Sequence, residues 1–542
     1  MPSSPAELVQ WLFASDLERA PRRLAARWLF LRALGLIFFS AFYSLLRQVN
    51  GLIGPDGLLP AQDYLQAIRQ VSGASRFWYV PTLLWLKSDS RSLLLLAWVG
   101  LIASVLLVLN FWPRGTIFIS LVAYLSFISA LQTFSSYQSD GMLLSAGFIS
   151  LFFAPPGFRP CWGERNPASR ASLFLLLLVW FTIYFESGVV KIASGDPEWR
   201  NLTAMVDYYQ NGPLPTWIGW YAHHLPHWFH VGTAAFTLAL ELVLVWLALL
   251  PRPFRIGLFW LVTPLQIGII LTSNYAFLNY LVLALGILLL DDKYLAVFLP
   301  RRLRGDRKQD TKSVADPSPI RAARANQGAR WGTLGRAFSS SGLWVAAFFQ
   351  TWVFYVIAAQ LVWMIVPRVP LPTSPVSTLE PFRIANQYGL FAVMTRGRYE
   401  IEFQGSTDGE KWTPYPFRYK PQDPREAPRI FAPYQPRFDW NLWFASLDNW
   451  QQNRFVIYAE ERLLTGSPSV LALFAGNPFP NAPPTQVRAV VWQYWFSDRA
   501  EKLQGLWWRR ELIGLYAPAL EREPDGKLLI TEYPQPGQRI RR

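Results

Sequence analysis

The chain has 542 residues, of which 52% are hydrophobic and 16% are aromatic, and its formal net charge is +15. Apolar runs close to the length of a membrane-spanning helix recur through the first 366 residues, which excludes an ordinary soluble protein. The basic residues cluster in the loops between these runs, so the positive charge indicates membrane orientation and not nucleic-acid binding.

The N-terminus is expected to be an uncleaved membrane anchor. Residues 1–22 contain a modestly amphipathic lead-in, PAELVQWLFASDLERA. The apolar run after it is long enough to span a bilayer, and no clear small-residue cleavage site follows it, as a signal peptide would require.

The apolar runs predict a polytopic α-helical membrane protein with eight or nine transmembrane helices. The predicted spans are Leu24–Leu46, Leu93–Phe111, Thr116–Phe134, Gly141–Ala154, Leu173–Lys191, Phe229–Leu250, Ile256–Leu271, Ala276–Phe298 and Leu343–Val366. The run Gly141–Ala154 is short, so it is tilted, re-entrant or packed inside the bundle.

Loop charge predicts the orientation of these spans. With nine spans and a cytoplasmic N-terminus, nearly every basic loop falls on the cytoplasmic side, RRLRGDRKQDTK most clearly. The loop after the first span departs from this rule, because it carries Arg69, Arg76 and Lys87. We expect a multi-pass inner (cell) membrane protein with a periplasmic, or otherwise extracytoplasmic, C-terminal domain.

The chain divides into a membrane domain (1–300), a basic cytoplasmic linker (301–342), a last span (343–366) and an extracytoplasmic α+β, β-rich domain (375–542). In the last part, TRGRYEIEFQGSTDGEKWTPYPFRYK predicts a hairpin and VRAVVWQYWFSD another strand. FDWNLWFASLDNW, NRFVIYAEERLLTG and SPSVLALFAG predict short helices. The single cysteine, Cys161, has no partner in the chain, so this domain folds without disulfides.

Ionisable residues at membrane depth are the first candidates for a site, because they are costly to insert there. Glu186 and Lys191 lie in one apolar run. Lys191 either snorkels to the surface or is a desolvated amine able to act as a base. Its candidate partners are Glu186, Asp140, Asp196 and Glu241. Glu186 and Lys191 are five residues apart, so a partner from another span is favoured.

All four histidines of the chain lie in YAHHLPHWFH. Pro226 suits a helix start, which would place His227 and His230 on one face. No carboxylate or cysteine is close, so the alternatives are a metal site, a proton-handling site and interfacial structure; we predict no metal. Under a catalytic reading, the candidates are Lys191, Glu186, His223, His224 and His230. P-loop, Rossmann, His-Glu-x-x-His and Gly-x-Ser-x-Gly motifs are absent.

Several segments together resemble one family. FESGVVKIASGDPEWRNLTAM, YAHHLPHWFH, SNYAFLNYL and Asp291–Asp292 are similar to the membrane half of the lipase maturation factors. NQYGLFAVMTRGRYEIEFQGS, PYQPRFDWNLWFAS, AGNPFP and WWRRELIGLYAP are similar to their C-terminal half. The resemblance covers roughly residues 25–520.

This resemblance implies a maturation or folding factor for exported proteins, with lipases as clients, membrane lipid as surroundings and no cofactor. Animal relatives reside in the endoplasmic reticulum membrane. Because this chain has no cysteine outside the predicted cytoplasmic loops, thiol exchange is not expected. The candidate client-binding residues are Asp196, Trp199, Arg200, Asp207, Tyr208, Asp439, Trp440 and Trp443.

A shorter resemblance implies an alternative. Gly188–Lys191 and Asp196–Trp199 are distantly similar to the membrane domain of vitamin K-dependent γ-carboxylases, in which the lysine matching Lys191 deprotonates a reduced quinone. The alternative is therefore a membrane enzyme that uses Lys191 as base and a quinone or lipid. A transporter is a third class, but no inverted repeat is visible.

Overall fold

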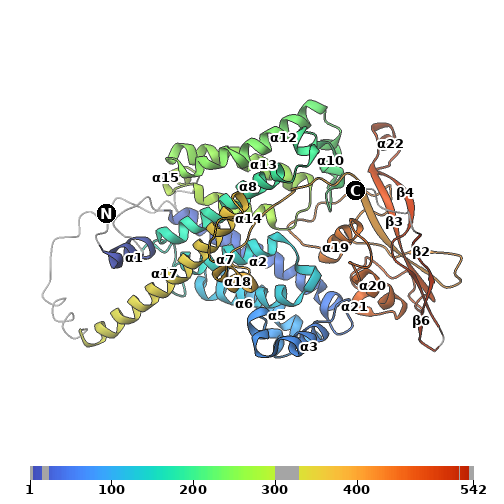
Figure 1. Cartoon of the computed structure of the whole chain (residues 1–542), viewed down its shortest axis with the longest axis horizontal. Helices are drawn as coiled ribbons and strands as arrows, with labels where there is room; N and C mark the ends of the chain where they lie inside the picture. Colours follow the sequence, from blue (N-terminus) through green and yellow to red (C-terminus); the bar gives the residue numbers. More distant parts are fainter. Residues whose placement is uncertain (1–3, 15–22, 299–328, 524, 536–542) are drawn as a thin grey trace.

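The computed structural model describes residues 4–14, 23–298, 329–523 and 525–535, with the backbone alone for 329–340. A helical bundle forms the first half of the chain, and a sheet with short helices forms the C-terminal part at one end of the bundle (Figure 1). The two parts share one hydrophobic core, which runs from the bundle into the sheet without a break.

Apolar helices of different lengths make up the bundle. They are α2 (Leu24–Ile53), α5 (Ser90–Val108), α6 (Pro113–Ala130), α7 (Gln138–Phe153), α8 (Arg170–Ala193), α12 (His227–Leu242), α13 (Arg252–Thr272), α14 (Leu278–Gly286) and α17 (Ala329–Ile365). Local sequence determines where several of these helices begin. The side chains of Asp89 and Ser169 cap α5 and α8 by accepting a backbone N–H of the first turn. Pro113 is the first residue of α6, a position that proline favours.

Short helices connect and flank the long ones. They are α1 (Pro5–Phe13), α3 (Ala61–Ser72), α4 (Arg76–Tyr79), α9 (Pro197–Arg200), α10 (Ala204–Asn211), α11 (Trp217–His223), α15 (Asp292–Leu295) and α18 (Ser374–Leu379). The sequence did not predict α3 and α4, which fill the long loop after α2.

Six helices among the described residues are long and apolar enough to cross a membrane: α2, α5, α6, α8, α13 and the part of α17 from Ser341 to Ile365. The remaining predicted spans coincide with shorter helices, α7, α12 and α14. A 3-10 turn, η4 (Leu244–Leu249), continues α12, and η5 (Ile287–Leu289) continues α14. A membrane-embedded helical half is therefore confirmed, whereas the count of nine spans stays a prediction.

One predicted boundary is wrong. The run Ala276–Phe298 is not one helix, because Asp291 caps a new helix by accepting the N–H of Tyr294, and Asp292 accepts the N–H groups of Leu24 and Ala25 at 2.9 and 2.7 Å. The last predicted span, Leu343–Val366, lies at the C-terminal end of α17, whose part that is apolar and long enough to cross a membrane is Ser341–Ile365. Of the predicted linker 301–342, residues 301–328 lie outside the described residues.

The C-terminal part is built on one sheet: β1 (Arg398–Ser406), β2 (Thr413–Pro414), β3 (Gln486–Phe496), β4 (Trp508–Leu515), β5 (Ala519–Arg522) and β6 (Leu528–Glu532). All pairs are antiparallel, in the order β2-β1-β3-β5-β6, and β4 pairs with the same edge of β3 as β5. The hairpin β1–β2 and the strand β3 match the sequence prediction, whereas β4, β5 and β6 were not predicted.

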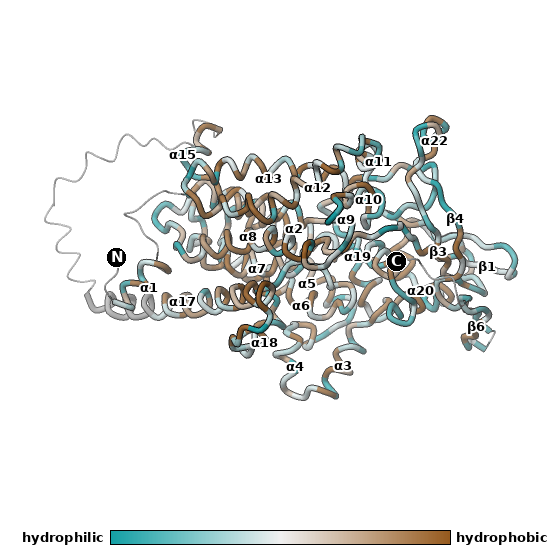
Figure 2. The backbone as a smooth tube through the Cα atoms, turned by 45° about the horizontal axis from the view of Figure 1, so that its top comes forward, coloured by the Kyte–Doolittle hydropathy of each residue, from teal (hydrophilic) through white to brown (hydrophobic). Residues whose placement is uncertain are grey.

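The short helices of this part cover the sheet on the side of the bundle (Figure 1). They are α19 (Arg437–Ser446), α20 (Phe455–Leu464) and α21 (Pro468–Leu471), and all three match the predicted helices. A further short helix, α22 (Arg499–Leu503), lies at the tip of the sheet, in the connection between β3 and β4 (Figure 1). Figure 2 shows the bundle helices as mostly apolar and the C-terminal part as mixed in hydropathy.

The two ends of the bundle differ in chemistry. The ends of the long helices that the C-terminal part contacts include Gly51 of α2, the loop before α7, Lys191 of α8 and Asn274 after α13. The opposite ends carry the basic residues that begin the next helices, such as Arg170 and Arg252. This separation agrees with the charge pattern used for the predicted orientation.

Candidate functional site at the junction of the two halves

A segment that enters the C-terminal part, residues 384–395, crosses the ends of α7 and α8; we call it the strap. The hydroxyl of Ser145 donates to the carbonyl of Ile384 at 2.6 Å, and the amide of Asn386 donates to the carbonyl of Gly141 at 2.9 Å. Glu186 is fully buried and accepts the N–H of Tyr388 at 2.6 Å. Glu186 therefore fixes the backbone of the strap.

Lys191 is held by two partners. Its ammonium lies 2.9 Å from both carboxylate oxygens of Glu241 on α12 and donates to the carbonyl of Leu390 in the strap at 3.0 Å. The side chains of Lys191 and Glu241 are 2% and 12% exposed. Glu241 is one of the four candidate partners, and it comes from another predicted span. In this arrangement Lys191 joins α8, α12 and the strap.

Two further predicted site residues, Trp199 of α9 and Asp196 at its N-cap, bind the strap. Asp196 accepts the N–H of Met394 at 2.6 Å, and the indole N–H of Trp199 donates to the carbonyl of Phe391 at 2.9 Å. The ring of Trp199 also lies 5.1 Å from the ammonium of Lys191. Asp196 and Trp199 are buried, so they position the strap.

Arg200 and Asp207 lie outside this contact. Arg200 is exposed at the end of α9. Asp207 is half-buried on α10, where burial, reinforced by the charge of Glu198, raises the pKa of its carboxyl. Neither residue contacts the strap through a side-chain hydrogen bond among the described residues.

The histidines do not form a metal site: no group of three His, Cys, Asp or Glu side chains among the described residues is arranged to hold an ion. The Nδ1 atom of His224 lies 2.8 Å from the carbonyl of Trp220, and the Nε2 atom of His230 lies 3.1 Å from that of Leu225. Burial, with a smaller effect of His224, lowers the pKa of His223 to about 4. His223 is therefore neutral at pH 7 and packs as an aromatic ring against Phe496.

A buried ion pair joins the two halves elsewhere. Arg437 on α19 donates to both carboxylate oxygens of Asp140 at 2.8 Å and to the carbonyl of Phe134 at 2.6 Å. The hydroxyl of Tyr124 donates to the same carboxylate at 2.6 Å. Both charged side chains are fully buried. The contact is bidentate, which is the geometry in which arginine–carboxylate pairs are strongest.

A second buried arginine lies at the start of β1. Arg398 is fully buried and donates to the backbone carbonyls of Gln210 and Pro213, each at 3.0 Å, and to that of Gly212. It also pairs with Glu400, which pairs in turn with Lys420 at 2.9 Å. Arg398 therefore attaches β1 to the end of α10 and the loop after it.

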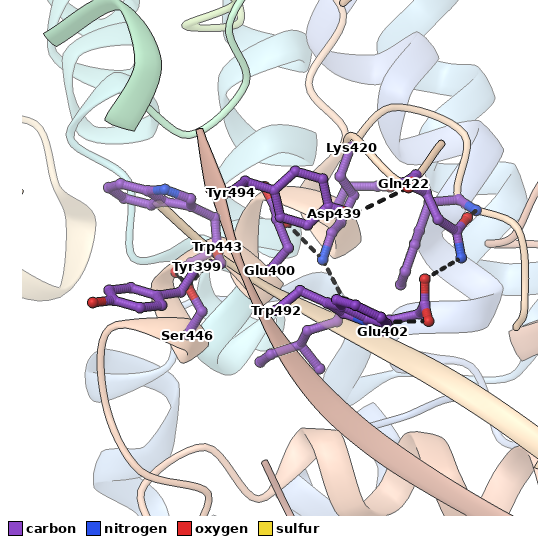
Figure 3. A network of polar contacts seen from close by, with 12 residues as sticks. Tyr399, Glu400, Glu402, Lys420, Gln422, Asp439, Trp443, Ser446, Trp492 and Tyr494 are labelled. Carbon is purple, nitrogen blue, oxygen red and sulfur yellow. Dashed lines mark hydrogen bonds and ion pairs between the residues drawn. The ribbon is translucent and has the colours of Figure 1, made fainter. Parts of the chain in front are cut away.

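Polar contacts continue along β1 into the sheet (Figure 3). Glu402 accepts the amide of Gln422 at 3.1 Å and the indole N–H of Trp492 at 3.2 Å. Asp439 is buried in the same region, where burial raises the pKa of its carboxyl to about 7 against the opposing effect of Lys420. Because Asp439 lies inside this network, it is not accessible to a client.

A cavity of about 400 Å³ lies where the strap, the bundle and α19 meet; we call it the junction cavity. Its size is within the range of ligand pockets, about 300–1,000 Å³. Aromatic rings and the strap backbone dominate its wall, and no charged side chain lines it among the described residues. The aromatic lining residues are Tyr137, Tyr208, Tyr275, Phe391, Trp440, Trp443 and Phe444.

The structure therefore separates the predicted site residues into groups. Tyr208, Trp440 and Trp443 line the junction cavity, whereas Lys191, Glu186, Asp196 and Trp199 hold the strap beside it. Sequence reasoning missed Arg398, Arg437 and most of the cavity rings. The available signal was the presence of both arginines inside apolar, aromatic segments, RGRYEIEF and PRFDWNLWF, where an unpaired charge would be costly.

Comparison with known proteins extends over both halves. Residues 25–297 match the model of the lipase maturation factor transmembrane domain, and residues 384–518 match that of the lipase maturation factor C-terminal domain. The chain belongs to the lipase maturation factor family. The predicted family is thus confirmed, and the strap and β1–β4 lie inside the second matched region.

Relatives in vertebrates cover nearly the whole chain. Lipase maturation factor 1 of Bos taurus is 31% identical over 96% of this chain and 94% of its own length. Lipase maturation factor 2 of Homo sapiens is 31% identical over 94% of this chain and 84% of its own length. No solved structure matches the chain.

Proposed function

We propose that this protein is a membrane-bound maturation factor that assists the folding of exported proteins, lipases among them. The observation that carries the proposal is that both halves match the family together, at 31% identity over 96% of the chain. The junction between these halves contains an uncharged aromatic cavity, which suits binding of an apolar client segment better than bond-making chemistry.

The state of Lys191 supports a binding role over the enzyme alternative. A base needs a free lone pair within hydrogen-bond reach of its substrate. The ammonium of Lys191 is occupied by Glu241 and by the carbonyl of Leu390, and the strap covers it. We propose that Lys191, Glu186, Asp196 and Trp199 position the strap. No contact among the described residues favours quinone-dependent chemistry.

For orientation, we propose a cytoplasmic N-terminus and an extracytoplasmic C-terminal domain in the cell membrane. The supporting feature is the separation of the bundle ends: the basic helix starts at Arg170 and Arg252 lie opposite the end that contacts the C-terminal part. Positive charge is typical of cytoplasmic loops. In this orientation the junction cavity faces the compartment of exported proteins.

Mass spectrometry of exported proteins tests this function, comparing a deletion strain with one restored by the intact gene. We expect a few exported proteins, lipases among them, to fall in amount or activity with unchanged covalent mass. If amounts hold and some proteins instead lose a fixed mass, such as that of one carbon dioxide, the protein is a modifying enzyme and the proposal is wrong.

A further inference from the structure

We propose that the junction cavity binds an extended stretch of unfolded polypeptide and accepts one large apolar side chain, aromatic by preference. This inference rests on the proposed function for its biological role, and it specifies the place and the kind of ligand. Four features of the cavity lead to it: the rings, the free indole groups, the unpaired strap backbone and the open mouth.

The rings of both halves form one continuous aromatic wall. Tyr275 lies 5.2 Å from Phe391 of the strap and 6.3 Å from Trp440, measured between ring centroids. Tyr137 lies 5.1 Å from Trp440 and 6.0 Å from Phe444. Rings at 4.5–7 Å make favourable offset or edge contacts, so a further aromatic side chain would find partners on several sides.

Two indole N–H groups at this wall have no partner. Trp440 and Trp443 are 6% and 8% exposed, and the Nε1 atom of neither has a hydrogen-bond partner among the described residues. Buried donors are nearly always paired. Both Nε1 atoms are covered in this conformation, so they favour a ligand that brings an acceptor only when the indole turns toward the cavity. A peptide carbonyl is such an acceptor, whereas a hydrocarbon chain has none.

The strap backbone beside the cavity is also partly unpaired. The N–H groups of Phe391 and Val393 and the carbonyls of Val393 and Met394 have no hydrogen-bond partner among the described residues. These residues line the cavity. Unpaired backbone donors and acceptors along one short segment can form hydrogen bonds with the backbone of a bound peptide, as happens when a peptide adds to the edge of a β-sheet. This favours a peptide over a lipid chain.

The cavity has an open, uncharged mouth. Val393 and Phe444 line it and are 65% and 45% exposed, and Ser136 and Gln138 beside them are also exposed. A client segment can therefore enter without unfolding either half. The uncharged lining disfavours Asp, Glu, Lys and Arg in the bound segment, because a charge would be desolvated without a partner.

Fluorescence anisotropy tests the inference with full-length protein in lipid nanodiscs. The probes are two fluorescein-labelled peptides, Gly-Ser-Gly-Trp-Gly-Ser-Gly and the same peptide with Ser in place of Trp. We expect the Trp peptide alone to bind. Val393→Glu at the mouth should weaken binding about tenfold or more, and Trp443→Phe should weaken it while keeping the ring. Leu503→Glu, at a position 90% exposed on α22 outside the cavity lining, is the matched control and should bind normally.

Equal binding of the two peptides, or normal binding to Val393→Glu, would overturn the inference. A sixteen-carbon fatty acid that displaces the peptide, and that no longer binds to the Val393→Glu variant, would also overturn the inference. The cavity would then be a lipid site. Lipase yield from the deletion strain separates this inference from the proposed function. Normal lipase yield after gene deletion, with peptide binding by the purified protein intact, refutes the proposed function alone. Lipase loss on gene deletion without peptide binding refutes the cavity alone.

Discussion

Replacement of Lys191 by Met tests whether Lys191 acts as a catalytic base or only positions the strap. Lys191→Met keeps the chain length of the side chain but leaves the carboxylate of Glu241 buried without its partner. Breaking one side of a buried ion pair costs about 3–5 kcal/mol of folding free energy. The carbonyl of Leu390 also loses its donor, which adds about 1 kcal/mol because that residue is only half-buried.

The double variant Lys191→Met, Glu241→Leu should recover most of this loss. It removes both charges, so only the unmet carbonyl of Leu390 remains, at about 1 kcal/mol. The single variant should therefore be less stable than the double variant by about 3–5 kcal/mol, equivalent to roughly a hundredfold or larger change in the folded-to-unfolded ratio. Lys87→Met is the matched control, since Lys87 pairs with Asp89 at the same 2.9 Å but is 69% exposed; an exposed pair contributes about 0–1 kcal/mol.

Unfolding of the purified variants in dodecyl sulfate mixed micelles, followed by circular dichroism, measures these differences, and lipase yield in cells measures function. If Lys191 positions the strap, function should follow stability, and the double variant should regain both. A double variant that is as stable as the parent but inactive would refute this reasoning and make Lys191 a base. Equal stability of the single and double variants would refute the assigned ion pair.

Four further predictions concern the contact between the halves and the pH dependence of stability. Arg437→Met should lower stability by about 3–5 kcal/mol in the same unfolding assay, because it leaves Asp140 buried and unpaired; an unchanged midpoint would contradict the contact. Gly51→Ala should destabilise by about 1–3 kcal/mol, since its Cβ would lie 2.5 Å from the carbonyl of Ser469, whereas Gly232→Ala in open space should be neutral or stabilising. The pKa of His223 is lowered to about 4, so stability should be full above pH 6.5 and fall between pH 6.5 and 4; His223→Phe should remove that fall in melting curves. The pKa of Asp439 is raised to about 7, so stability should fall as pH rises from 4 to 7, and Asp439→Asn should flatten that part of the curve.

Sequence reasoning predicted what depends on local pattern. Apolar runs located the long helices, and alternation around Ser406–Gly409 located the hairpin, because both signals lie within about twenty consecutive residues. It failed where the structure depends on contacts between segments that are far apart in the sequence. The strand β6 was missed although it pairs with β5, because all its residues are exposed and it has no buried face.

The same limit applies to the site. Sequence pattern identified Lys191 and Glu186 as unusual, since charge at membrane depth is visible in one window. Their role depends on backbone groups of the strap about 200 residues later, and backbone groups carry no residue-type signal. For the same reason the sequence did not reveal that Arg398 joins the two halves, because its acceptors in the membrane half are backbone carbonyls at and after the end of α10.

The arginine at the start of β1 also sets an order of assembly. Chains are made from the N-terminus, so the carbonyls of Gln210, Gly212 and Pro213 exist before Arg398 emerges. The membrane half therefore supplies acceptors for Arg398 that are already made when the last third of the chain is synthesised. A fragment starting at residue 375 would leave Arg398 and Arg437 without their partners in the membrane half, among exposed aromatic side chains, and such surfaces favour aggregation.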